Sequence, residues 1–337
     1  MTEPRKTLAD IASLSGVSLA TVSKVLNGRA GVSAARREQI LKVLDEEGYR
    51  RRGTSIRHRT GLIDIVVRGM DTLWATLILV GAQEEAARAG VGLVVTPSHG
   101  RTVGNRHWIT SLAQRHSDGL VLVVSRLQPG ADNELRKLRI PYVLVDPIGT
   151  PDDDVPVIGA TNVDGGISAT EHLLGLGHRR IAIVTGDRGL ACSQDRLAGY
   201  RQALDRAGIP VDEELVAYGN FQEEAGYAAA DRFLRLKNPP TAIFAGSDLM
   251  AFGVYKAVKA HGLSIPGDIS VVGFDDVSLC QWVSPPLTTV RQPLQEMARE
   301  ATRILLEMAY QGIEPPAHKV ELPTSLVLRE STAPPKG

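Results

Sequence analysis

The chain has 337 residues, a length that predicts two or three domains. Hydrophobic residues make up 43% and charged residues 23%, which is typical of soluble globular proteins. No run of 18 apolar residues occurs and the first residues lack the apolar stretch of a secretory signal peptide, so we expect no membrane association and a cytoplasmic location. The two cysteines, Cys192 and Cys280, exclude a disulfide framework and lack the spacing of a zinc site or redox pair.

The net charge of zero conceals a basic first segment. Residues 1–59 hold 12 Lys and Arg against six Asp and Glu, so this segment carries +6 and the remaining 278 residues carry −6. A basic segment on an acidic body predicts a polyanionic partner for that segment alone. Solubilisation is the alternative explanation of the charge, and the residue pattern within the segment decides between the two.

Residues 1–48 carry the pattern of three short helices. Thr7 with Asp10 resembles a capping box that opens the first helix, Ser18 is placed to cap the second, and Ser33 caps the third. The expected apolar faces comprise Leu8, Ile11, Ala12 and Leu14, then Val22, Val25 and Leu26, then Ile40, Leu41, Val43 and Leu44. Two helices around a tight turn at Gly16, supported by a third, are typical of a helix-turn-helix unit. A bundle without a DNA role would not need small and polar residues on the exposed side of its second helix.

Beyond Gly61, strand-like runs alternate with helical stretches. The expected strands cover 62–67, 92–96, 119–124, 142–145, 180–184, 241–244 and 269–274, and the expected helices include 77–89, 163–176, 194–207, 223–236 and 249–261. This alternation predicts a parallel sheet with helices on both faces. About 270 residues favour two lobes over one sheet.

The first segment resembles the DNA-binding head of LacI/GalR-type transcriptional regulators. The signature is VSLATVSKVLNG, followed by VS and by a third helix that ends in GY. The resemblance continues through GHRRIAIVTGD, DRLAGYRQAL, AIFAGSDLMAFGVYKA, ISVVGFDD, PPLTTV and LPTSLVLREST, in the family's order and spacing. It implies an α/β fold class, in which a small all-α three-helix head precedes a two-lobed parallel-sheet body like that of the periplasmic sugar-binding proteins, with an effector in the cleft.

The resemblance also implies domain boundaries. The head would span 1–48, the basic linker 49–60, the effector-binding and dimerisation body 61–331, and the tail 332–337. One lobe would combine about 61–160 with 293–320, and the other about 161–291 with 322–331. Crossovers near Thr161, Gln292 and Leu322 would form the hinge between the lobes, and closure around a ligand is the expected motion.

The resemblance assigns DNA contacts to the second helix. Leu19 and Ala20 occupy the specificity positions, where apolar side chains would contact thymine methyl groups, and Lys24 could donate to guanine O6 or N7. Other expected contacts, mostly to phosphates, are Thr7, Ser18, Thr21, Ser23, Asn27, Arg51 and Arg57; solvated helix surface is the alternative for Thr21 and Ser23. The linker lacks the family's Ala-Arg-x-Leu, so Ile56 is its only candidate for a minor-groove wedge, with packing on the body as the alternative.

The resemblance places effector contacts one residue at a time. Asp146 ends a strand of the first lobe, Arg196 matches the arginine that forks onto hydroxyls or a carboxylate, and Asp275 matches an acid that accepts from hydroxyls. Ser247 stands where relatives often have Asn. Trp74 and Trp282 could stack on a ring, with core packing or a dimer interface as the alternative for each. The alternative for Arg196 is an internal ion pair.

These patterns predict a sequence-specific DNA-binding repressor that acts as a homodimer on a palindromic operator in double-stranded DNA. We expect its effector to be a neutral sugar or oligosaccharide, with a purine or nucleoside as the alternative, acting as inducer or as corepressor. Two acids in the cleft would repel an anionic ligand unless further basic residues entered it. The tail has no leucine heptads, so no coiled-coil tetramer is expected.

Other functional classes fit the sequence less well. No GxGxxG follows a strand, and GxxxxGK[ST], HExxH and GxSxG do not occur, so we expect no enzyme, no cofactor and no metal. A solute-binding protein for transport is contradicted by the attached helix-turn-helix and the missing signal peptide.

Overall fold

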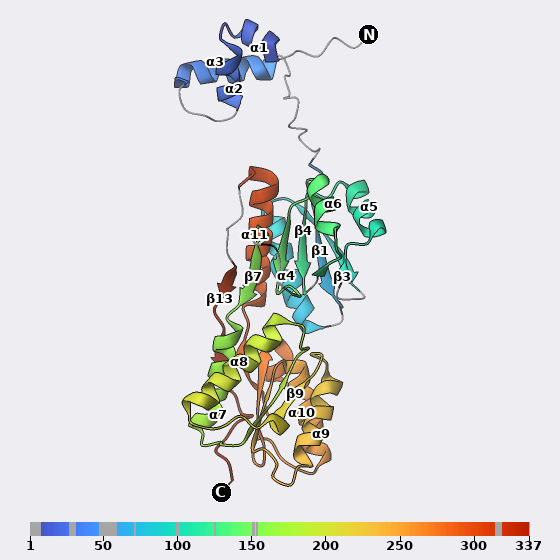
Figure 1. The fold of residues 1–337 in the computed structure, drawn as a ribbon, viewed down its shortest axis with the longest axis vertical. Coiled ribbons are helices and arrows are strands. Elements are labelled where there is room, and N and C mark those ends of the chain that lie inside the picture. Colours follow the sequence, from blue (N-terminus) through green and yellow to red (C-terminus); the bar gives the residue numbers. More distant parts are fainter. Residues whose placement is uncertain are drawn as a thin grey trace. The chain divides into compact units, whose positions relative to one another are not determined.

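The computed structural model describes residues 8–26, 32–46, 59–70, 72–98, 102–124, 126–149, 152, 154–313 and 319–336. The chain forms two compact units, a head (Met1–Arg59) and a body (Thr60–Gly337). The head is helical and the body holds two six-stranded sheets with helices on their faces (Figure 1). The predicted fold class, an all-α head before a two-lobed parallel α/β body, is confirmed.

The head consists of α1 (Leu8–Leu14), α2 (Leu19–Leu26) and α3 (Ala34–Glu46). Its core is formed by Ile11, Ala12, Val22, Val25, Ile40 and Leu44. Ser18 precedes α2, and its hydroxyl accepts the Thr21 N–H at 3.2 Å, which satisfies a donor at the start of the helix. The predicted burial of Leu14 and Leu41 is wrong, because both are about half exposed, at 51% and 50%. Successive side chains on a helix are rotated by about 100°, and this rotation places Leu14 and Leu41 beside the buried face of their helices and not on it.

The first lobe is built on an entirely parallel sheet in the order β13-β7-β6-β4-β1-β2. Its strands are β1 (Leu62–Arg68), β2 (Gly92–Ser98), β4 (Gly119–Val123), β6 (Tyr142–Val145), β7 (Val157–Ala160) and β13 (Val320–Leu322). Helices α4 (Leu73–Arg88) and α11 (Leu294–Leu306) share one apolar core with this sheet, and α5 (Arg106–Arg115) and α6 (Ala131–Lys137) share another. The short strands β3 (Thr102–Val103) and β5 (Arg126–Leu127) pair separately, and the π-helical turn η3 (Glu307–Gln311) follows α11.

The second lobe repeats this plan with the strand order β14-β12-β11-β10-β8-β9, in which only β14 runs antiparallel to its neighbour. The strands are β8 (Ile181–Thr185), β9 (Val216–Tyr218), β10 (Ala242–Ala245), β11 (Ser270–Asp275), β12 (Thr288–Arg291) and β14 (Ser325–Val327). Helices α7 (Asn162–Gly175) and α8 (Ala191–Arg206) cover one face, while α9 (Glu223–Leu234) and α10 (Asp248–Ala260) cover the other (Figure 1). The short turns η1 (Glu213–Leu215) and η2 (Ser278–Gln281) complete the lobe.

The chain passes between the two sheets three times, after β7, after β12 and after β13. Two of these passages are bonded to each other. The hydroxyl of Thr161 accepts the Thr324 N–H at 3.0 Å, and the Thr324 hydroxyl donates to the Thr161 carbonyl at 3.1 Å. The lobes are therefore joined by three short segments, two of which are bonded to each other, and short connecting segments of this kind can act as a hinge.

The residues after β14 lie along the second lobe and are held there by two histidines. Nε2 of His178 lies 2.9 Å from the Ala333 carbonyl, and Nε2 of His172 lies 2.9 Å from the Thr332 hydroxyl. A carbonyl only accepts, so Nε2 of His178 carries the proton and Nδ1 accepts from the Thr241 hydroxyl at 2.8 Å. Burial lowers the pKa of both histidines below the ordinary value of 6.5, so the neutral forms hold this C-terminal segment.

We therefore expect the histidines to make the body less stable in acid. Because their folded-state pKa values are lowered, the unfolded chain binds more protons below about pH 6.5, and the free energy of unfolding falls as pH drops from there towards the folded pKa values. Urea unfolding of the wild type and of a His172→Gln/His178→Gln variant at pH 7.5 and pH 5.5 measures the effect.

The double variant should lose less stability between the two pH values than the wild type does. Buried carboxyls elsewhere in the body act in the opposite direction, but they are common to both proteins and cancel in the comparison. His107→Gln, at an exposed residue of α5, is the control and should behave like the wild type. Equal losses in the wild type and the double variant would contradict the role given to the two histidines.

Candidate functional site

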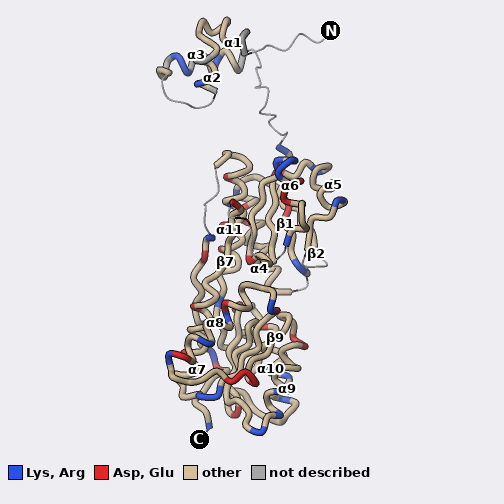
Figure 2. Tube along the Cα trace, viewed as in Figure 1, with Lys and Arg blue, Asp and Glu red and all other residues tan. Residues whose placement is uncertain are grey.

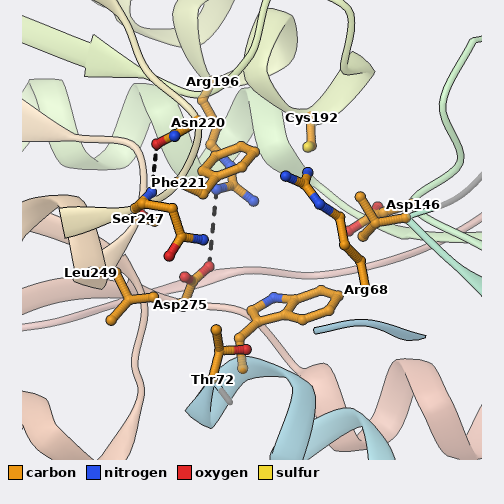
Figure 3. A pocket seen from close by; sticks show the side chains of 13 residues that line it. Arg68, Thr72, Asp146, Cys192, Arg196, Asn220, Phe221, Ser247, Leu249 and Asp275 are labelled. Atoms are coloured by element: carbon orange, nitrogen blue, oxygen red, sulfur yellow. Dashed lines mark hydrogen bonds and ion pairs between the residues drawn. The ribbon is translucent and has the colours of Figure 1, made fainter. Parts of the chain in front are cut away.

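A pocket of about 110 Å³ lies in the body, lined by residues of both lobes (Figure 3). The first lobe contributes Arg68, Thr72, Trp74, Val124 and Asp146, and the second contributes Cys192, Arg196, Asn220, Phe221, Gln222, Ser247, Leu249 and Asp275. Most of these residues stand where a strand ends or a helix begins, because the carboxyl ends of the parallel strands in both sheets meet here. Crevices at this edge are the usual ligand sites of open parallel sheets.

Three pocket residues at strand ends have backbone torsions that side-chain-bearing residues rarely adopt. The φ angles are 43° at Val124, 45° at Asp146 and 125° at Asp275. Such conformations cost on the order of 1–3 kcal/mol each and persist only where the surrounding structure determines them. Val124 and Asp146 directly follow the buried strands β4 and β6, and Asp275 is the last residue of the buried strand β11, so the sheets hold these residues in conformations that are unfavourable for an isolated residue.

Arg196 is a buried cation with fixed partners. It is 3% exposed; its Nε donates to Oδ1 of Asn162 at 2.9 Å and its Nη1 donates to the Gly246 carbonyl at 2.5 Å. Oδ1 of Asp275 lies 3.9 Å from Nη1, an ion pair drawn in Figure 3. The guanidinium also lies 3.8 Å above the ring centroid of Phe274. The sequence suggested two alternatives for Arg196, a place in the effector pocket or an internal ion pair. Both are present in the structure.

Close packing of α7 against α8 brings Arg196 to Asn162. A Cβ atom at Gly166 would lie 2.4 Å from the Arg196 carbonyl oxygen, and one at Gly199 would lie 2.2 Å from the Val163 carbonyl oxygen. Both distances are far below van der Waals contact, so the two helices reach this separation only with glycine at these positions. The hydrogen bond from Arg196 to Asn162 thus depends on glycines that the pocket never contacts.

Asp275 and Asp146 are both less acidic than ordinary aspartates. Burial raises the pKa of Asp275, and the charge of Arg196 opposes that rise. Nε2 of Gln292 donates to Oδ1 of Asp275 at 2.6 Å. Burial raises the pKa of Asp146 to about 6, again against the opposing charge of Arg196. Each carboxyl can accept hydrogen bonds from a ligand, and each is readily protonated.

Ser247 has a structural bond as well as a place in the pocket. Its hydroxyl oxygen accepts the Met250 N–H at 3.2 Å and so caps α10, while its O–H can still donate to a ligand. The next residue, Asp248, is fully buried and accepts from the Thr289 hydroxyl at 2.6 Å and from the Val277 N–H at 2.8 Å. Asp248 therefore holds the second lobe together behind the pocket wall.

The structure brings five of the six predicted effector residues together, namely Trp74, Asp146, Arg196, Ser247 and Asp275. Trp282 is not a pocket residue: it is 81% exposed and does not line the cavity. The turn η2 buries Cys280 instead, and two residues later the chain faces solvent. Sequence reasoning missed Arg68, Thr72, Val124, Asn220, Phe221, Gln222 and Leu249. For Arg68, its position beside the end of a predicted strand was a usable signal.

In the head, the exposed residues of α2 include Leu19, at 51%, and Lys24, while Thr21 and Ser23 are half-buried. The hydroxyls of Ser18 and Thr21 lie 2.8 Å apart. Figure 2 colours basic positions along the trace of α2 and α3, which carry Lys24, Arg36, Arg37 and Lys42. The side chain of Ala20 is not described, and Thr7, Asn27, Arg51, Ile56 and Arg57 lie outside the described residues. Leu19 and Lys24 are thus accessible to a DNA groove.

Other chemistry finds no support within the described residues. They contain no group of three His, Cys, Asp or Glu that could hold a metal ion, and no helix among them is long and apolar enough to cross a membrane. Burial raises the pKa of the Cys192 thiol to about 12, so at neutral pH this pocket cysteine is a thiol and a poor nucleophile.

Comparison with known proteins gives matches over both units. Residues 7–52 match the family model "Bacterial regulatory proteins, lacI family", and residues 170–332 match "Periplasmic binding protein-like domain". The HTH-type transcriptional regulator CelR of Thermobifida fusca is 34% identical over 97% of this chain and 98% of its own length. The structure of a CelR–cellobiose complex has a TM-score of 0.74 at 33% identity, covering 97% of this chain and all of that one.

A lac repressor dimer bound to operator and the anti-inducer ONPF is also similar, with a TM-score of 0.70 at 27% identity, covering 98% of this chain and all of that one. These similar proteins are DNA-binding regulators and not enzymes.

The buried position of Asp275 leads to a prediction about stability. Because its folded-state pKa is raised, the folded body favours the uncharged carboxyl, so Asp275→Asn removes a charge that burial disfavours. We expect the free energy of unfolding at pH 8.5, from urea denaturation without ligand, to be unchanged or raised by about 1 kcal/mol. A loss of more than about 1 kcal/mol would instead make the contact with Arg196 a necessary structural ion pair.

Proposed function

The chain belongs to the lacI family of bacterial regulatory proteins, and on this premise we propose that a sugar bound between its two lobes controls repression of transcription by its head. The observation that carries the proposal is the pocket itself, in which Asp146 of one lobe faces Arg196 and Asp275 of the other. A ligand that bonds to both lobes stabilises one separation of the lobes over others, and this is what effector control needs.

The chemistry of the pocket suits a polyhydroxylated ring. Carboxyl oxygens accept from hydroxyls and guanidinium groups donate to them, while Trp74 and Phe221 offer aromatic surface to the apolar face of a ring. The similar CelR structure contains cellobiose, which supports a sugar for this chain as well. A purine or nucleoside is the second candidate, because an aromatic side chain in the pocket could stack on a base.

For the head, we propose that residues 1–48 read an inverted repeat as a homodimer in the cytoplasm, with the basic linker 49–60 on phosphates. One head exposes a single recognition helix, and a small module buries too little surface for tight specific binding. The similar lac repressor structure is a dimer on its operator, which supports this arrangement. Binding selection should recover a two-fold symmetric site, and affinity should fall steeply with salt.

Substitutions in the head should separate base reading from phosphate binding. Lys24→Ala is expected to weaken binding to the selected operator by about 1–3 kcal/mol and to change binding to random DNA little, because a guanine contact carries sequence information. Arg51→Ala should weaken both about equally, because phosphates are the same in every sequence. Electrophoretic mobility shifts on the two DNAs measure this difference. The role of Lys24 is refuted if both variants show the same selectivity.

Asp275→Asn also tests the pocket through DNA release. The variant should bind the operator as the wild type does, since the head is unchanged, but should require about tenfold more effector for release, because the amide offers a ligand hydroxyl one accepting oxygen in place of the two oxygens of the carboxyl group. Titration of the protein–operator complex with effector measures the midpoint. An unchanged midpoint would remove Asp275 from the ligand site, and tighter operator binding on ligand addition would make the effector a corepressor.

A further inference from the structure

Arg68 is a second arginine in the pocket, and its environment differs from that of Arg196. It is the last residue of β1, and its side chain points into the pocket (Figure 3). Among the residues that the structure describes, the Arg68 side chain has no hydrogen-bond or ion-pair partner. Arg196, by contrast, uses its donors on Asn162, Gly246 and Asp275.

This difference indicates that Arg196 has a structural role and that Arg68 is available to bind a ligand. Arg196 donates from Nε and Nη1 to groups of the second lobe, so removing it would disturb the pocket wall as well as the ligand. Arg68 is half-buried, and its guanidinium has five N–H donors that nothing in the described part of the chain takes up. A planar fork of this kind matches the two oxygens of a carboxylate or phosphate, and such paired hydrogen bonds are among the strongest in proteins.

The two acidic residues of the pocket do not neutralise the charge of Arg68. Asp275 is matched by Arg196 at 3.9 Å and by the amide of Gln292 at 2.6 Å. Asp146 lines the same pocket as Arg68 without forming an ion pair with it, so the carboxyl group does not take up the donors of Arg68. The repulsion of anions expected from two acids alone is therefore opposed by a basic residue that enters the cleft from the first lobe.

We infer that the effector carries an anionic group, a carboxylate or a phosphate ester, and that Arg68 selects it. The inference rests on the proposed function, because it places this group on the sugar bound between the lobes. In this arrangement Arg68 of the first lobe binds the anion, while Asp146 and Asp275 accept from ring hydroxyls. The effector is then a sugar acid or a sugar phosphate and not a neutral sugar.

The test uses the full chain and neutral and anionic ligands that share the same sugar rings. Glucose is compared with glucuronate and with glucose 6-phosphate, and cellobiose with cellobiuronate, by isothermal titration calorimetry and by the shift in melting temperature. In at least one set the anionic member should bind about tenfold or more tightly than its neutral partner, the effect of about 1.4 kcal/mol for a charge-assisted pair. A preference for glucuronate or for glucose 6-phosphate identifies the group.

Variants of Arg68 then assign the selectivity. Arg68→Met should weaken the anionic ligand about tenfold while leaving the neutral partner within about twofold, and Arg68→Lys should retain part of the selectivity, because it keeps the charge but not the fork. Arg126→Met, at an exposed arginine of the same lobe outside this pocket, is the matched control and should change neither affinity. An unchanged melting temperature of the ligand-free Arg68→Met protein shows that the fold is intact.

Two results would overturn the inference and leave the proposed function standing. The first is a neutral sugar that binds as tightly as its anionic partner; the second is an equal loss of both ligands in Arg68→Met, which would make Arg68 a donor to hydroxyls. If no sugar of either kind binds and a nucleoside raises the melting temperature, the sugar proposal is wrong and the inference falls with it.

Discussion

The pocket depends on one buried guanidinium. Arg196 joins the start of α7 through Asn162, the end of β10 through the Gly246 carbonyl and the end of β11 through Asp275. A charge removed from water must be matched in this way, because an unpartnered buried ion costs several kcal/mol. The three elements can therefore shift relative to one another only by breaking bonds to the same cation. These contacts hold the second-lobe wall of the pocket together without a ligand.

The same bonds connect the pocket to the passages between the lobes. Asn162 follows Thr161, which is bonded to Thr324 across two of these passages, and Gln292 lies in the remaining one and donates to Asp275. A ligand that draws on Asp275 or Arg196 thus competes for groups that also hold the hinge segments. Coupling between ligand and lobe separation then needs no long pathway, since the two processes share hydrogen-bonding atoms.

Much of the fold was predictable because its longer elements carry strong local signals. The N-cap and the spacing of apolar residues in α2 predict a helix, and apolar runs such as 62–67 and 269–274 predict strands, in each case from a few neighbouring residues. Strands β7, β9, β12, β13 and β14 were not predicted. Each has three or four residues, a length at which local signals are weak, although β6 and β10 are no longer than four residues and were predicted from their apolar runs. The site divides similarly: the family resemblance led to Arg196 and Asp275, whereas Phe221 follows β9 and had no local signal. Trp282 lies close to Asp275 in sequence, but closeness along the chain does not determine whether a side chain points into the pocket or into solvent.

The pocket also shows why a residue type alone does not define a role. Two arginines line one cavity. Arg196 lies in the second turn of α8, which packs closely against α7 at glycine positions, and Arg68 lies at the end of β1. The first position surrounds the cation with carbonyl, amide and ring, so most of its interaction energy is used within the chain. At the second position, the end of β1, the N–H donors of Arg68 face the cavity. Because a ligand gains most from groups that are already oriented and still unpartnered, recognition falls to the arginine that contributes least to the fold.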